Sequence, residues 1–114
     1  MDEFDMLRTA YRDFNVRNIE AVLARMSPDV AWANGMEGGH VRGVDAVREY
    51  WQRQFATLNP HVEPLGIGRD ADGRFQVRVH QTVRDLDGKL LLDTEVRHFY
   101  TINGGLIARM DINV

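Results

Sequence analysis

Apolar and polar positions alternate along the second half of the chain. Apolar side chains occupy every second position at Phe75, Val77, Val79 and Val83, and period-two alternation is typical of a strand with one buried face. Asp87-Gly88 and Asn103-Gly104-Gly105 then favour tight hairpin turns, because these residue types adopt positive φ at little cost. The pattern predicts three long antiparallel strands, at about residues 75–84, 90–102 and 106–114.

The alternation also assigns the side chains of the last two strands to faces. One face of the second strand carries Val96, His98 and Tyr100, and the other carries Glu95, Arg97 and Phe99. One face of the last strand carries Leu106, Ala108, Met110, Ile112 and Val114, and the other carries Ile107, Arg109, Asp111 and Asn113. A sheet with one apolar face needs a cover, which the first half of the chain must supply.

In the first half, apolar residues recur at steps of three and four, which is the spacing of one helix face. The first stripe predicts a helix from about Glu3 to Val16 and consists of Phe4, Leu7, Tyr11 and Phe14. A shorter helix follows, with Asn18 as its N-cap, and ends at Ser27-Pro28 because the residue before proline avoids the helical region. The longest helix runs from about Val44 to Leu58, with a stripe of Val44, Val47, Trp51, Phe55 and Leu58.

The remaining segments predict a short strand, a loop and a weak strand. Residues 30–34 form the short strand, and a loop over residues 35–43 holds four glycines and His40. Residues 61–69 form a strand that Pro64 interrupts, so we expect it to be bent or to lie at a sheet edge. Helices first and antiparallel strands later predict one α+β domain over residues 1–114. The simplest packing curls the sheet around the longest helix and leaves a cone-shaped pocket.

Composition narrows the class of protein. The net charge of −3 argues against a nucleic-acid-binding surface, which is normally basic. No apolar run approaches the roughly 18 residues of a membrane span. The chain has no cysteine, which excludes disulfides and thiolate sites, and its four histidines lack paired ligand spacing. We therefore expect no metal or other cofactor, and we expect a cytoplasmic location because the acidic N-terminus lacks a signal-peptide pattern.

Two segments resemble a known family. Residues 41–51 (VRGVDAVREYW) and residues 97–107 (RHFYTINGGLI) are similar to the SnoaL-like and ketosteroid-isomerase-like branch of the nuclear transport factor two superfamily. The resemblance covers nearly the whole chain. It implies a cystatin-like, cone-shaped α+β barrel, in which a strongly curved, mostly antiparallel sheet wraps three N-terminal helices. It also implies a small-molecule pocket and a homodimer that forms through the outer face of the sheet.

The resemblance also locates the positions where steroid isomerases carry their catalytic groups. Their carboxylate base corresponds to Asn34, and an amide cannot accept a substrate proton at neutral pH. Their oxyanion hole pairs a protonated aspartic acid with a tyrosine. The aspartic acid falls near Arg97 or His98, and the tyrosine falls near Ala10, beside Tyr11. None of the three groups is clearly present, so steroid-type isomerisation is not the expected activity.

SnoaL-type cyclases instead use an acid–base aspartate with histidines, for which Asp111 and His98 are the candidates here. His40, in the glycine loop, is a separate candidate for a general base near neutral pH. Simple alternation puts Asp111 and His98 on opposite faces, although a bulge could bring them together. The candidate ligand contacts are Tyr11, Phe14, Trp32, Asn34, Trp51, Phe55, Arg97 and Phe99. Each candidate also has an ordinary structural interpretation. His40 can be a solvated loop residue, His98 a hydrogen-bonded core residue, Asn34 a turn former, and Arg97 part of a solvated or dimer-facing charge ladder.

These observations leave several classes of function open. The first is a small-molecule-binding protein that acts as an isomerase, cyclase or hydratase on a hydrophobic carbonyl-containing ligand. The second is a non-catalytic ligand-binding or accessory dimer. The third is a protein-interaction module, which would have a filled interior and an exposed apolar patch. The lining of the cavity should discriminate between them, because a carboxylate or histidine with a matched pKa favours an enzyme.

Overall fold

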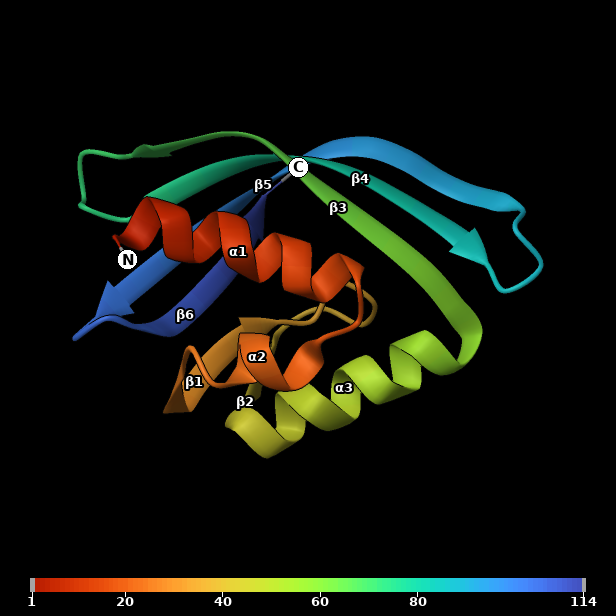
Figure 1. Ribbon diagram of the computed structural model, residues 1–114, viewed down its shortest axis with the longest axis horizontal. Coiled ribbons are helices and arrows are strands. Elements are labelled where there is room, and N and C mark those ends of the chain that lie inside the picture. The colour runs from red at the N-terminus through yellow and green to blue at the C-terminus, as the bar shows by residue number, and fades with distance from the viewer. Residues whose placement is uncertain (1, 114) are drawn as a thin grey trace.

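The computed structural model describes residues 2–113, and within them it has three helices and six strands (Figure 1). The helices are α1 (Glu3–Asn15), α2 (Ile19–Leu23) and α3 (Val44–Thr57). The strands are β1 (Met26–Ala33), β2 (His40–Arg42), β3 (Leu58–Arg69), β4 (Phe75–Asp85), β5 (Leu90–Asn103) and β6 (Leu106–Asn113). The helices lie on the concave side of the sheet, with α1 directly beneath it.

The sheet has the strand order β2-β1-β6-β5-β4-β3. Neighbouring strands are antiparallel except β1 and β6, which are parallel. The sheet is strongly curved and does not close, so β2 and β3 are its edges. The predicted α+β class, with three helices packed in a curved and mostly antiparallel sheet, is confirmed, and β3 lies at an edge as Pro64 indicated.

The second helix is shorter than the apolar stripe of Ile19, Val22, Leu23 and Met26 predicts. It ends at Leu23, and the chain enters β1 at Met26 rather than at residue 30. The reason is pairing with the last strand, since the Ile107 amide donates to the Arg25 carbonyl at 2.8 Å and Met26 is paired with Ile107. Part of the predicted glycine loop also forms a strand, because residues 40–42 pair with residues 31–33.

Simple alternation is wrong at the start of the last strand. Ile107 is 1% exposed and Met110 is 2% exposed, so both face the core although they have opposite parity. The cause is a register shift between β5 and β6 near Ile102, where an extra residue changes which side chains point inward. The predicted position of Val114, on the same face as Met110, lies outside the described residues.

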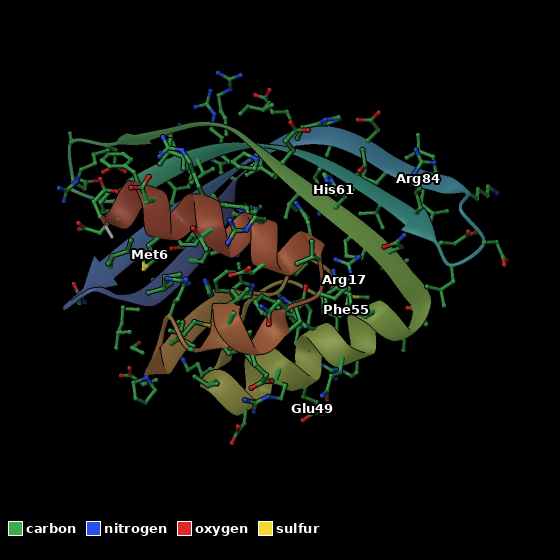
Figure 2. The ribbon with its side chains drawn as sticks, in the orientation of Figure 1. Met6, Arg17, Glu49, Phe55, His61 and Arg84 are labelled. Atoms are coloured by element: carbon green, nitrogen blue, oxygen red, sulfur yellow. The ribbon has the colours of Figure 1, made fainter. Side chains whose placement is uncertain are left out.

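Arg17, just after α1, connects this helix to the start of β3 by hydrogen bonds. Its guanidinium donates to Asn59 Oδ1 at 2.6 Å and to the Pro60 carbonyl at 2.7 Å. The same group lies 4.4 Å from the ring centroid of Phe55, and Figure 2 shows the two side chains next to each other. This contact places the end of α3 close to α1 on one side of the molecule.

Asn15 joins the last turn of α1 to the edge strand β3. Its side-chain nitrogen donates to the Val62 carbonyl at 2.7 Å, and its side-chain oxygen accepts from the Val62 amide at 2.9 Å. One carboxamide therefore satisfies both backbone groups of an edge residue, which a neighbouring strand would otherwise have to pair.

We expect Asn15→Ala to lower the free energy of unfolding by about 1–3 kcal/mol, because it leaves two partly buried backbone groups of Val62 without partners. Urea denaturation measures the change. Asn113→Ala is the control, since this exposed residue should change stability by no more than about 0.5 kcal/mol. Equal stabilities of the two variants would contradict the proposed role of Asn15.

Candidate functional site

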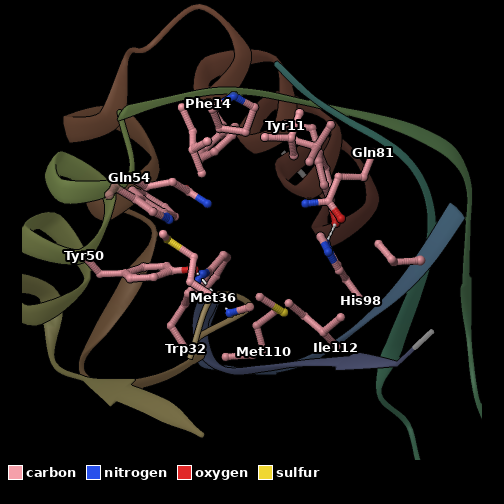
Figure 3. A pocket seen from close by; sticks show the side chains of 18 of the residues that line it. Tyr11, Phe14, Trp32, Met36, Tyr50, Gln54, Gln81, His98, Met110 and Ile112 are labelled. Carbon is pink, nitrogen blue, oxygen red and sulfur yellow. Dashed lines mark hydrogen bonds between the residues drawn. The ribbon is translucent and has the colours of Figure 1, made fainter. Parts of the chain in front are cut away.

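A cavity of about 590 Å³ lies between the helices and the concave face of the sheet (Figure 3). Its walls come from all three helices, from strands β1, β3, β4, β5 and β6, and from the loop after β1. Both tryptophans of the chain, Trp32 and Trp51, line it, and their rings meet edge to face with centroids 5.4 Å apart. The interior is therefore hollow, and its volume is that of a typical small-molecule site.

Among the described residues, no charged side chain lines this cavity. Most of the wall is aliphatic or aromatic. Hydrogen-bonding side chains other than the tryptophans come from Tyr11, Tyr50, Gln54, Gln81, Thr94, His98 and Tyr100. The site can therefore donate and accept hydrogen bonds, but it offers no carboxylate that could act as a base.

Three buried side chains form a hydrogen-bonded chain at the cavity wall. The Tyr100 hydroxyl donates to the Tyr11 hydroxyl at 2.8 Å, and the Tyr11 hydroxyl is hydrogen-bonded to His98 Nδ1 at 2.7 Å. We assign Tyr11 as the donor of the second bond, because this assignment gives the proton of its buried hydroxyl an acceptor. Because Nδ1 accepts, the proton of the neutral ring sits on Nε2. Among the described residues Nε2 has no partner, so it is an N–H donor available to a ligand.

Burial keeps the groups of this chain neutral. It lowers the pKa of His98 to about 4, because desolvation disfavours the imidazolium ion. Burial also raises the pKa of Tyr11, an effect that neighbouring Tyr100 increases, and burial raises the pKa of Tyr100. At neutral pH these three side chains are therefore uncharged, His98 Nε2 is their one donor open to a ligand, and proton transfer to or from them is unfavourable.

Exposed apolar side chains from three segments surround the mouth of the cavity. They are Met36 from the loop after β1, Leu91 and Leu92 from β5, and Ile112 from β6. Near Met36, the Tyr50 hydroxyl accepts from the Gly35 amide at 3.2 Å, which holds the loop against α3. A ligand would therefore enter between apolar groups.

The structure separates the three predicted catalytic residues. His98 lines the cavity, but His40 and Asp111 lie on the other side of the sheet, where His40 Nε2 donates to Asp111 Oδ1 at 2.8 Å. Arg109 Nε also donates to Asp111, at 2.9 Å. Burial alone would raise the pKa of Asp111, but the hydrogen bonds from Arg109 and His40 lower it overall. The hypothetical Asp111–His98 pair does not form, because Asp111 is paired with Phe99 on the opposite face to His98.

Four of the eight predicted ligand contacts line the cavity, namely Tyr11, Phe14, Trp32 and Trp51. The other four, Asn34, Phe55, Arg97 and Phe99, are not part of its lining. Asn34 Oδ1 accepts from the Met36 and Glu37 amides, so it caps its own loop. Phe55 packs under Arg17, Arg97 is exposed, and the Arg74 guanidinium covers Phe99 at 4.8 Å.

Several lining residues did not emerge from the sequence patterns, although some left a signal there. Gln81 has the parity of Val79 and Val83, so it is a polar residue on an apolar strand face. Gln54 lies four positions after Tyr50 and three after Trp51, so it shares their helix face. A polar residue within an apolar stripe is a signal of a cavity wall that the periodicity alone could have provided.

The pH dependence of stability should report the burial of His98. Between pH 6.5 and about 4 the unfolded chain binds a proton at this residue and the folded chain does not. The contribution of His98 is therefore present above pH 6.5 and is lost as the pH falls towards 4. We expect a loss on the order of 2–3 kcal/mol between pH 7 and pH 4 that His98→Asn removes.

Urea denaturation of both proteins across this pH range measures the difference. His80→Asn is the matched control, because His80 lies on the outer face, bonded to Asp93 at 2.6 Å. A pH profile of His98→Asn that parallels the wild-type profile would show that His98 titrates normally in the folded protein.

Searches of sequence and structure place the chain among known proteins. The model of the SnoaL-like domain family matches residues 7–110. No protein in the curated set matches. Among the described residues, no cluster of His, Asp or Glu could hold a metal ion, and no helix is long and apolar enough to cross a membrane.

Three solved structures illustrate the similarity. TerC, co-crystallised with polyporic acid, has 26% identity and a TM-score of 0.83 over 96% of this chain and 88% of its own. A candidate polyketide cyclase of Sinorhizobium meliloti has 24% identity and a TM-score of 0.77 over 96% and 94%. An uncharacterised cystatin-fold protein of Novosphingobium aromaticivorans has 20% identity and a TM-score of 0.84 over 100% and 99%. The predicted resemblance is confirmed, and the chain belongs to the SnoaL-like domain family.

Proposed function

We propose that this protein binds a neutral, largely apolar small molecule that carries a carbonyl group. The observation that carries the proposal is a cavity without charged side chains whose wall holds one buried N–H donor, His98 Nε2. A carbonyl oxygen is the simplest partner for such a donor. The hydrogen bond from Tyr11 to Nδ1 fixes the ring and keeps the donor on the cavity side.

The absence of charge among the lining residues argues for a neutral ligand. An ion that enters an apolar cavity loses its hydration, and without a counter-ion this cost is not recovered. The mouth of the cavity also favours entry of a neutral ligand over an ion, because it is formed by the apolar side chains of Met36, Leu91, Leu92 and Ile112. TerC, the 26%-identical relative crystallised with polyporic acid, supports a small organic ligand in this fold.

Non-catalytic binding is the form of this function that the chemistry favours. An isomerase, cyclase or hydratase of the expected kind needs a group that takes a proton, and the cavity lining contains no carboxylate among the described residues. His98 is a weak base, since its pKa is about 4 and its Nδ1 is already occupied. One feature supports catalysis, because an N–H donor at a carbonyl oxygen would polarise it. The expected homodimer and cytoplasmic location stay predictions.

Ligand binding can be tested with the wild-type protein and a panel of neutral polycyclic ketones and neutral polyketides, with polyporic acid as a separate acidic ligand for comparison. A ligand that binds only the folded state stabilises it by about 2.7 kcal/mol when its free concentration is 100 times its Kd. We expect a concentration-dependent rise in Tm for neutral ketones. Both tryptophans line the cavity, so the same ligands should change the intrinsic fluorescence.

A cavity-filling variant separates binding in the cavity from binding elsewhere. Val83 lines the cavity beside Leu92, so Val83→Phe should weaken binding at least about tenfold, which corresponds to roughly 1.4 kcal/mol. Thr82→Phe places the same ring on the opposite face and should leave binding unchanged. The proposal is wrong if no member of the panel raises Tm, or if the two variants bind equally well.

A further inference from the structure

Two carboxamides face each other across the cavity. Gln54 projects from α3 and Gln81 from β4, and Figure 3 shows both side chains pointing into the open space from opposite walls. Both are partly buried. Within the described part of the chain, neither side-chain amide has a hydrogen-bond partner. Each amide can both donate and accept, so together they can hold a hydroxyl or a carbonyl group.

A third neutral polar group lies at the same level of the sheet. Thr94 on β5 is the pairing partner of Gln81, and both line the cavity. Further along β5, Val96 is buried and apolar, and His98 follows it on the same face. The cavity wall therefore has two polar levels with an apolar band between them.

The geometry of a strand gives the separation of these levels. Thr94 and His98 are four residues apart on β5, and a strand rises about 3.3 Å per residue, so the levels are about 13 Å apart. Side chains that lean into the cavity shorten the distance between the atoms that would contact a ligand. A rigid molecule of two rings in line can reach both levels at once.

The geometry points to a ligand with two separated oxygen atoms on an apolar frame. One oxygen accepts a hydrogen bond from His98 Nε2. The second lies between Gln54 and Gln81, beside Thr94, and we call these three residues the second station; it is nearer to Leu92 and the mouth of the cavity. This inference rests on the proposed function and adds the class of ligand, which is an elongated neutral molecule with a carbonyl at one end and a hydroxyl or carbonyl at the other.

The alternative is that the amides only face water in an open cavity. In that case their removal would not discriminate between ligands, because each ligand would lose or gain the same solvent contacts. The second station predicts discrimination, since a hydrogen bond is lost only when the ligand has a group to make it. A pair of probes that differ in one terminal oxygen can therefore separate the two explanations.

The probes are para-acetylbiphenyl, which has one oxygen, and the same ketone with a hydroxyl group at the far para position. Isothermal titration calorimetry gives their Kd values for the wild type, Gln54→Leu and Gln81→Leu. We expect the hydroxyketone to bind the wild type more tightly than the ketone, and each variant to weaken the hydroxyketone by roughly five- to tenfold. Binding of the simple ketone should stay within about twofold, because it leaves the station empty.

Matched controls are available on the same elements. Gln52→Leu changes an exposed glutamine of α3, and Gln76→Leu changes a glutamine of β4 that does not line the cavity. Neither should alter the Kd of either probe. Thermal unfolding confirms that every variant is folded before its Kd is compared.

The possible outcomes distinguish this inference from the function on which it rests. The second station is overturned if the hydroxyketone does not bind the wild type, or if Gln54→Leu and Gln81→Leu change both probes equally or change neither. The proposed function itself is overturned by different results, namely failure of the whole panel of neutral ligands to bind the wild type, or equal binding by Val83→Phe and Thr82→Phe. Selective weakening of the hydroxyketone in both variants supports the two-oxygen ligand.

Discussion

A chain of buried hydrogen bonds between α1 and β5 is the constraint on which fold and site both depend. Tyr100, Tyr11 and His98 satisfy one another at 2.8 Å and 2.7 Å, and a buried hydroxyl or imidazole without a partner would cost free energy. These hydrogen bonds hold α1 against β5, and the two hydrogen bonds between the Asn15 side chain and the Val62 backbone hold the end of α1 against β3. Because α1 is held at both places, it cannot move into the cavity beside it, and the cavity stays open.

Periodicity predicts most of this fold because burial on one face controls most positions. It fails where pairing with a distant strand decides the outcome. The stripe that ends at Met26 is helical in spacing, yet Met26 belongs to β1 because Ile107 pairs with it. Ile107 is itself inward because of a register shift near Ile102, and no local pattern shows where an extra residue will fall.

The site is less predictable than the fold for a related reason. The family resemblance predicts an acid and histidines in the site. His40 and Asp111 are instead hydrogen-bonded to each other on the outer face of the sheet, and the described residues that line the cavity are uncharged. Gln81 is visible as a polar residue on an apolar face, and Gln54 as a polar residue on an apolar helix stripe. Each glutamine interrupts an apolar face. In this chain such an interruption predicts a cavity-lining position better than the presence of a histidine or an aspartate does.

The position of Asn34 shows why a base is not easily added to this cavity. Its side-chain oxygen accepts from the Met36 and Glu37 amides, so the side chain is directed to its own loop. An aspartate in that conformation would receive the same two hydrogen bonds, which stabilise the ionised form and lower its pKa. Such a carboxylate would be both misdirected and a weak base. The local structure around Asn34 therefore holds the side chain at this position on its own loop, away from the neutral hydrogen-bonding groups that line the cavity.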